Sequence, residues 1–108
     1  MSVTIGDMRH RLQLEAPLTS ADGGGGVTRT WSLVAEVWAA LQPVSGNEVS
    51  EADGVSGRVS HEVWIRYRTG VLPEMRFRLG TRVFEIRSVI DTGERHRFLR
   101  CLAEERIA

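Results

Sequence analysis

The chain has 108 residues, of which 42% are hydrophobic, and this size and composition predict one domain with a buried core. Fourteen basic and fourteen acidic residues give a formal net charge of zero, which excludes a strongly basic module that binds nucleic acid through bulk charge. No segment approaches the roughly 20 apolar residues of a membrane span, and residues 1–10 lack the apolar core of a signal peptide. The one cysteine, Cys101, cannot form an internal disulfide. We therefore expect a single soluble, intracellular domain.

The charges are distributed unevenly along the chain, and all fourteen basic residues are arginine. Residues 1–57 carry three arginines and seven acids, a net charge of −4, whereas residues 58–108 carry eleven arginines and seven acids, a net charge of +4. Arginine suits interfaces because its planar guanidinium pairs with carboxylates and stacks on aromatic rings. A GC-rich genome also favours arginine, and solvated strand faces also produce such asymmetry. The sequence leaves head-to-tail contact between copies as one of these interpretations.

A half-buried strand is predicted over residues 9–16, because apolar and polar side chains alternate there. One face carries His10, Leu12, Leu14 and Ala16, and the other carries Arg9, Arg11, Gln13 and Glu15. We expect Pro17 to end this strand and residues 17–26, which include four successive glycines, to form a flexible, exposed loop. A phosphate-binding loop is the alternative, but no Gly-Lys-Ser/Thr motif follows the glycines.

Residues 27–43 fit two periodicities. A strand would place Trp31, Leu33, Ala35, Val37, Ala39 and Leu41 on one face, whereas a helix would align Trp31, Val34, Trp38 and Leu41. The flanking glycines and the threonine and valine content favour one long, bent strand. Residues 44–57 are too polar and too long for an ordinary turn, and loops beyond about 12 residues are usually functional or disordered. We expect this segment to be a flexible loop, because its glycines and serines offer little apolar area to offset the entropy of ordering.

The β pattern returns after residue 57 and continues to the C-terminal end. Strands are predicted over residues 58–68, 75–79, 82–90 and 95–103. The third of these has an apolar face of Phe84, Ile86, Ser88 and Ile90. A hairpin turn is expected at residues 91–94, where Gly93 can take a positive φ. The predicted fold class is therefore all-β: a small six-stranded antiparallel barrel or sandwich, with the barrel preferred, and one long polar loop.

The sequence contains no combination of residues that predicts catalysis. His10, His61 and His96 lie in three different predicted strands and lack the spacing of metal ligands. Cys101 lies in an apolar alternation, which favours a buried, unreactive side chain over a nucleophile. Glu104 and Glu105 are expected at a frayed, solvated end. We therefore predict a protein that is not an enzyme and has no catalytic residues, metal site or cofactor.

A small β-barrel that binds single-stranded nucleic acid, similar to an OB-fold, is the alternative function. Its candidate residues are Trp64 and Tyr67 with Arg66 and Arg68. The two aromatic residues point to opposite faces of one predicted strand, so they cannot form a single stacking platform.

Several short motifs follow one another in a characteristic order. The first half contains GDMRHRLQLEAP, DGGGGVTRTW and VAEVWAALQPVSGNE, and the second contains HEVWIRYRTGVLPEMRFRLGTRVFEIRSVIDTGERHRFLRCLAEE. This ordered set, which covers nearly the whole chain, resembles the phage head–tail joining family. These proteins are the small head-closure, or stopper, proteins of long-tailed phages and related gene transfer agents.

The resemblance implies a β-barrel that forms a ring between the portal–adaptor complex and the tail, in the neck of a particle assembled in the host cytoplasm. The implied partners are further copies of the chain, a portal-bound adaptor, a tail terminator or tail tube protein, and packaged double-stranded DNA in the channel, with no membrane. The resemblance also implies that the long loop gates the channel, through Ser45, Gly46, Asn47, Glu48, Glu51 and Asp53. Contacts with neighbouring subunits are expected from Arg9, Arg11, Arg66, Arg68, Arg76 and Arg78. We expect a monomer in dilute solution that forms a ring, sixfold or twelvefold, on its neighbours.

Overall fold

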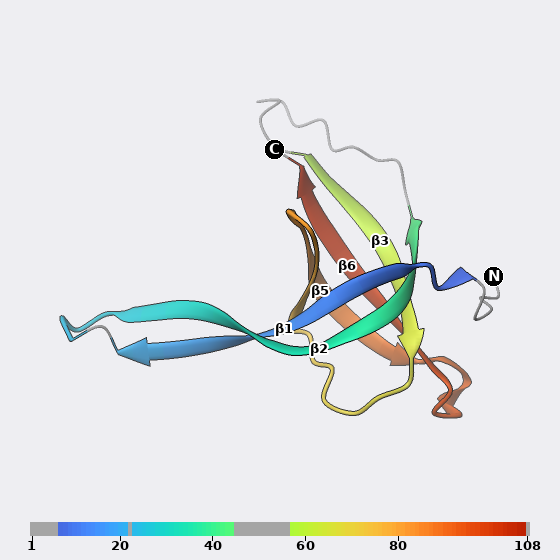
Figure 1. Ribbon diagram of the computed structural model, residues 1–108, viewed down its shortest axis with the longest axis horizontal. Helices are drawn as coiled ribbons and strands as arrows, with labels where there is room; N and C mark the ends of the chain where they lie inside the picture. The colour runs from blue at the N-terminus through green and yellow to red at the C-terminus, as the bar shows by residue number, and fades with distance from the viewer. Residues whose placement is uncertain (1–6, 22, 45–56, 108) are drawn as a thin grey trace.

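The computed structural model describes residues 7–21, 23–44 and 57–107, and these residues form six strands (Figure 1). The strands are β1 (His10–Ala21), β2 (Val27–Pro43), β3 (Gly57–Arg66), β4 (Arg76–Leu79), β5 (Arg82–Asp91) and β6 (Phe98–Ile107), and a short 3-10 helix, η2 (Thr92–Glu94), joins the last two. The strand interpretation of residues 27–43 is thus confirmed with the same bounds. Within the described residues, no helix has the length and apolar character needed to cross a membrane.

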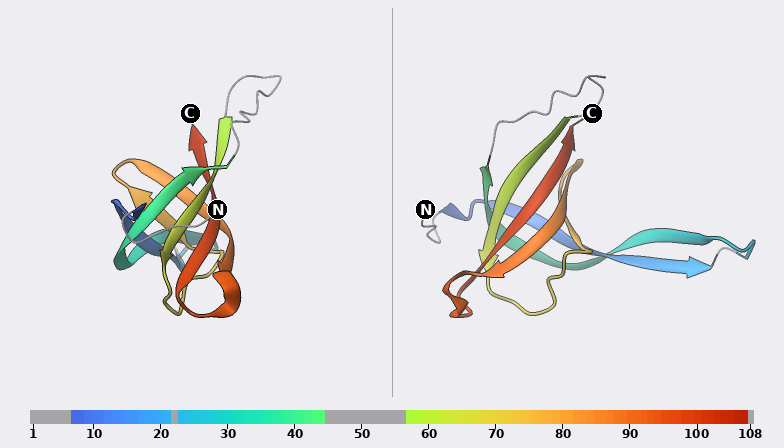
Figure 2. Two further views of the ribbon diagram at one scale, coloured as in Figure 1. Left: turned by 90° about the vertical axis from the view of Figure 1, so that its right-hand side faces the viewer. Right: turned by 180° about the vertical axis from the view of Figure 1, so that it is seen from behind.

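All six strands are antiparallel to their neighbours, in the order β1-β2-β3-β6-β5-β4. The sheet then closes on itself, because β4 also pairs with residues 13–15 of β1. Figure 2 shows the resulting ring of strands from two further directions. The predicted all-β class with six antiparallel strands is confirmed, in the form of one ring-shaped sheet.

The core fills the inside of this ring with side chains from alternate strand positions, as the pleat of a sheet requires, and with Val71 and Met75 from the connection between β3 and β4. Its buried members are Leu12, Leu14, Ala39, Val63, Ile65, Val71, Met75, Phe77, Phe84, Ile86, Leu99, Cys101 and Ala103. Cys101 is fully buried, as its apolar alternation predicts, and burial raises the pKa of its thiol to about 12. A second, smaller cluster on the outer surface joins Met8, Ala40 and Trp64.

The predicted end of the first strand at Pro17 is wrong. β1 continues to Ala21, and its outer half pairs with the first residues of β2, Pro17 opposite Trp31. No third strand joins this part of the described sheet, so each of the two strands has an open edge there. An open edge tolerates a proline, because the missing N–H removes no ladder hydrogen bond. Only the tip of the predicted 17–26 loop is therefore a turn.

Two bulges interrupt the alternation that predicts which side chains face inward. Val34 has no partner on β1, because β2 advances by two residues where β1 advances by one. As a result Leu33, which the alternation placed on the apolar face, is 56% exposed. Arg87 forms the corresponding bulge in β5, so that Val89 packs against the core and Ile90, predicted to point inward, is exposed.

The C-terminal segment also differs from its prediction. β6 runs to Ile107 and pairs along its whole length with β3, so Glu104 and Glu105 lie in an ordered strand rather than at a frayed end. His96, predicted within a strand, lies in the connection before β6, with a positive φ of 56°. The turn at Gly93 is confirmed, with a φ of 70°.

Candidate assembly surfaces

The outer parts of β1 and β2 extend away from the closed sheet as a two-stranded arm, formed by residues 18–21 and 27–30 (Figure 1). Every residue of these two segments is exposed, and the apolar side chains of Leu18 and Val27 are 52% and 74% exposed. Figure 2 shows that the arm stands clear of the other strands. A two-stranded hairpin that covers no core is marginally stable in water. The arm is therefore a surface that gains stability when another molecule covers it.

Two arginines of β4 hold the base of the arm to the closed part of the sheet. Nε of Arg76 donates a hydrogen bond of 2.7 Å to Oε1 of Glu15, and its guanidinium lies 4.1 Å from the ring centre of Trp31. Arg78 donates two hydrogen bonds to Oε1 of Gln13, of 3.1 and 2.8 Å, and its Nε lies 3.4 Å from Oε2 of Glu15. These contacts join β4 to β1 at the place where the sheet closes. Arg76 and Arg78, predicted as contacts between subunits, are thus engaged within the chain.

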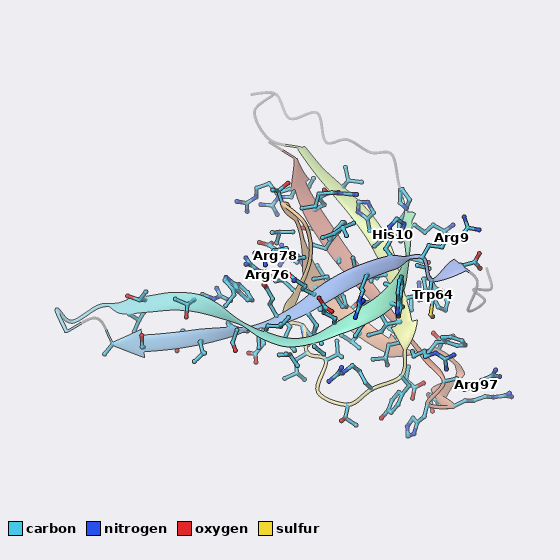
Figure 3. The ribbon with its side chains drawn as sticks, in the orientation of Figure 1. Arg9, His10, Trp64, Arg76, Arg78 and Arg97 are labelled. Atoms are coloured by element: carbon cyan, nitrogen blue, oxygen red, sulfur yellow. The ribbon has the colours of Figure 1, made fainter. Side chains whose placement is uncertain are left out.

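The predicted contact residues are spread over several surfaces, as Figure 3 shows for Arg9, Arg76 and Arg78. Arg9 lies at the N-terminal approach to β1, far from the two arginines of β4. Arg11 forms an exposed ion pair of 3.0 Å with Glu36 and lies over the ring of Trp38, 5.6 Å from its centre. The structure therefore does not gather these four arginines into one patch.

Arg66 and Arg68 lie together, at the end of β3 and just beyond it. They line a hollow of about 240 Å³ with Val37, Trp38 and Tyr67. The structure brings Trp38 of β2, rather than Trp64, beside Tyr67, because Ala39 pairs with Ile65 across the two strands.

Trp64 and Tyr67 stay apart, as the strand alternation predicts. Trp64 is buried in the outer cluster, and its Nε1 donates a hydrogen bond of 3.1 Å to Oε1 of Glu62. Tyr67 packs against the main core, and its ring stacks on that of His96 with 4.4 Å between the ring centres. The stacking platform required by the nucleic-acid alternative is therefore not formed by this pair.

The remaining arginines of the second half mostly pair with acids on adjacent strands. Arg82 donates from Nε and Nη2 to both carboxylate oxygens of Glu105, at 2.7 and 2.9 Å, and His61 approaches the same carboxylate at 3.7 Å. The hydrogen bonds from Arg82 hold the pKa of Glu105 below its ordinary value. Further pairs join Arg58 and Arg87 to Glu104, and Arg100 to Glu62. Several arginines of this half thus meet a carboxylate within the chain, whereas the net charge of +4, which already counts these acids, remains.

The described residues contain no group of three or more histidine, cysteine, aspartate or glutamate side chains placed to hold a metal ion. The arginine and aromatic side chains that they present are of the kinds enriched at contact surfaces. The closed sheet, the projecting arm and the arginine-lined hollow together define a small all-β protein with several exposed surfaces.

The chain belongs to the phage head completion protein family, whose model matches residues 3–106. It is also similar to a chain in the virion of a native gene transfer agent particle, with 31% identity over 92% of this chain and 94% of that one, and a TM-score of 0.77. A second similar structure is protein SF1141 from Shigella flexneri 2a, with 25% identity over 95% and 96% of the two chains and a TM-score of 0.67. No curated protein matches the chain.

These findings confirm the resemblance seen in the ordered sequence motifs. The family is one of structural virion proteins, and its match, with that of the virion particle, supports a role in joining head and tail. Of the surfaces above, the arm was not predicted from the sequence. The sequence does contain an indication of the arm, because residues typical of strands lie on both sides of the glycine run. Threonine and valine residues follow the run, and Leu18 and Thr19 precede it.

Proposed function

We propose that this protein is a head-closure, or stopper, component that forms a ring between a portal-bound adaptor and the tail, with packaged double-stranded DNA passing through the ring. Family membership and the similarity to a gene transfer agent virion chain support the head–tail joining role. The exposed arm is the structural feature that best supports ring formation. It is a formed element whose apolar side chains find no cover in the described chain.

The arm and the closed sheet are different surfaces, so contact of one subunit's arm with the next subunit's body is heterologous. Heterologous contacts produce closed rings when the rotation between neighbours allows it. Covering the exposed part of Leu18 or Val27 contributes about 2 kcal/mol each, on the scale of about 25 cal/mol per Å² of apolar area. Such modest contacts suit a protein that is a monomer in dilute solution and assembles only on the particle.

The proposed gate is the segment between β2 and β3. Its named residues, from Ser45 to Asp53, lie outside the described residues, which end at Val44 and resume at Gly57. The proposal rests on the sequence: Glu48, Glu51 and Asp53, repeated around a ring, make a negative collar that repels phosphate. A gate that retains DNA and later lets it slide should not bind the DNA backbone tightly, and this segment has no arginine.

Deletion of the gene from the particle-producing genome tests the joining role. Heads filled with DNA and separate tails are expected, and a plasmid copy of the gene should restore joined particles. Normal tailed particles from the deletion strain would overturn the proposal. Salt-sensitive binding of single-stranded oligonucleotides by the isolated protein would instead favour the nucleic-acid alternative.

A further inference from the structure

The hollow between β2 and the end of β3 combines apolar walls with two arginines. Val37 and Tyr67 are partly buried in its walls, and Trp38 is 54% exposed. Arg66 is exposed, whereas Arg68 is partly buried. The volume of about 240 Å³ is enough for one large side chain and a neighbouring carboxylate rather than for an extended ligand.

The two arginines of this hollow differ from those elsewhere on the sheet. Most of the others that are described pair with a carboxylate or an amide oxygen: Arg11, Arg58, Arg76, Arg78, Arg82, Arg87 and Arg100. Neither Arg66 nor Arg68 forms a side-chain hydrogen bond or ion pair with a described residue. Nε of Arg68 is moreover buried from solvent without an acceptor. Native proteins rarely leave a buried charged donor unsatisfied, so the guanidinium of Arg68, a residue that lines the hollow, retains unused hydrogen-bonding capacity.

The walls of the hollow are held in place before any ligand arrives. Tyr67 is fixed on one side by its stacking on His96, with 15° between the ring planes, and its backbone N–H donates a hydrogen bond of 3.0 Å to the carbonyl of Arg97. Trp38 is covered on one side by Arg11, which forms an exposed ion pair with Glu36. A preformed site loses less conformational entropy on binding.

We propose that this hollow binds an acidic peptide segment of another particle protein, which has a carboxylate next to an apolar side chain. The carboxylate accepts hydrogen bonds from Arg66 and Arg68, and the apolar side chain lies between Trp38 and Tyr67. Planar guanidinium groups pair with carboxylates through two parallel hydrogen bonds. The identity of the partner as a particle protein rests on the proposed function, whereas peptide binding is a property of the isolated chain.

A nucleic acid fits the hollow less well. Affinity for a phosphate backbone comes from several phosphate contacts along a basic track. Here only two unpaired arginines face the hollow, and the carboxylate of Glu36 stands beside Trp38 through their shared contact with Arg11. The zero net charge of the chain adds no long-range attraction for DNA.

The probe is the peptide acetyl-Asp-Trp-Glu-Leu-Asp-Phe with a free carboxyl terminus, added to the isolated ¹⁵N-labelled protein. We expect saturable binding that shifts the Arg68 Nε–H and Trp38 indole N–H signals. The matched peptide with Asn and Gln in place of the acids and an amidated terminus should bind at least tenfold more weakly. Equal binding of both peptides, or an Arg68 signal that does not move, would overturn the proposal.

Variants distinguish binding of the peptide in the hollow from nonspecific attraction to positive charge on the protein. Arg68→Ala should weaken binding of the acidic peptide at least tenfold, and Arg68→Lys should restore little, because lysine lacks the planar fork. Arg58→Ala removes the same charge at the opposite end of β3 and should leave binding unchanged. Tighter binding of a single-stranded oligonucleotide than of the peptide, lost in Arg68→Ala, would assign the hollow to nucleic acid instead. Because these measurements use the isolated protein, their failure leaves the joining role, tested by gene deletion, untouched.

Discussion

Glu15 of β1 accepts a hydrogen bond of 2.7 Å from Nε of Arg76 of β4, across the seam where the sheet closes. The carboxylate side chain is only 7% exposed, although it points to the outer surface, because Arg76 and Arg78 cover it. The same Arg76 lies over Trp31, at the root of the arm. One ion pair thus links closure of the sheet to the position of the proposed contact element.

Replacement of Glu15 by glutamine should destabilise the fold, because two arginines lose the charge of a buried partner. We expect a loss of about 2 kcal/mol in the free energy of unfolding, as is typical of a hydrogen bond to a charged group. Urea denaturation measures this loss. Glu36→Gln is the matched control: it removes an ion pair in which both partners are well exposed, and should cost under about 1 kcal/mol. Equal losses in the two variants would contradict the role of Glu15.

The pairing of Glu105 with Arg82 should make stability depend on pH in the acid range. The hydrogen bonds from Arg82 lower the folded-state pKa of Glu105 below the ordinary value of 4.5. The unfolded chain therefore binds a proton first as the pH falls, and the stabilisation present above pH 4.5 is lost as the pH falls through the folded-state pKa. Urea denaturation between pH 6 and pH 3 checks this. Glu105→Gln should be less stable at pH 6 and should show a shallower fall in stability toward pH 3.

Cys101 should be inert in the folded protein. Its side chain is fully buried, so a reagent cannot reach the sulfur atom. Burial also raises the pKa of its thiol to about 12, so almost none of the reactive thiolate is present at pH 8. We expect Ellman's reagent to react completely in 6 M guanidinium chloride and more than a hundredfold more slowly in buffer. Rapid reaction of the native protein, at the rate of a small free thiol, would show that the strands of the core open locally.

The arm should matter for assembly and not for folding of the monomer. The double variant Leu18→Ser with Val27→Ser removes exposed apolar groups, so the midpoint of thermal unfolding should change little. Particle joining in a complementation assay should fall at least tenfold. Leu72→Ser, which alters a similarly exposed leucine outside the arm, is the matched control and should support normal joining. Normal joining of particles with the arm variant would show that the arm forms none of the contacts needed for joining.

Shortening the segment between Ser45 and Gly57 tests the proposed gate. If the segment faces the channel, particles should still join, but packaged DNA should leak from them. Nuclease sensitivity of the particle DNA measures the leak. Joined particles that retain their DNA and infect normally would reduce the segment to a connector. A segment of the same length, with glutamine and asparagine replacing Glu48, Glu51 and Asp53, separates the effect of charge from that of length.

Alternation of apolar and polar side chains was enough to predict the six strands, most of the core and the absence of a Trp64–Tyr67 platform. These features depend on the two-residue period of a strand, which is a local property of the chain. Burial of Cys101 and the positive φ of Gly93 follow from the same local patterns. The ordered motifs, in turn, were sufficient to indicate the family.

Other features depended on which strands lie beside one another. The bulges at Val34 and Arg87 arise from pairing between strands, so the alternation beyond them cannot be read from the chain alone. Glu105 is ordered because β6 pairs with β3 to its end, and β1 continues past Pro17 because β2 returns along it.

The hollow is the clearest case, since Trp38 joins Tyr67 and Arg68 only through the register of β2 on β3. Sequence periodicity determined the elements of this protein, whereas long-range pairing decided its surfaces. The physical reason is that the direction of a side chain follows from its own backbone, but its neighbours follow from contacts between distant segments.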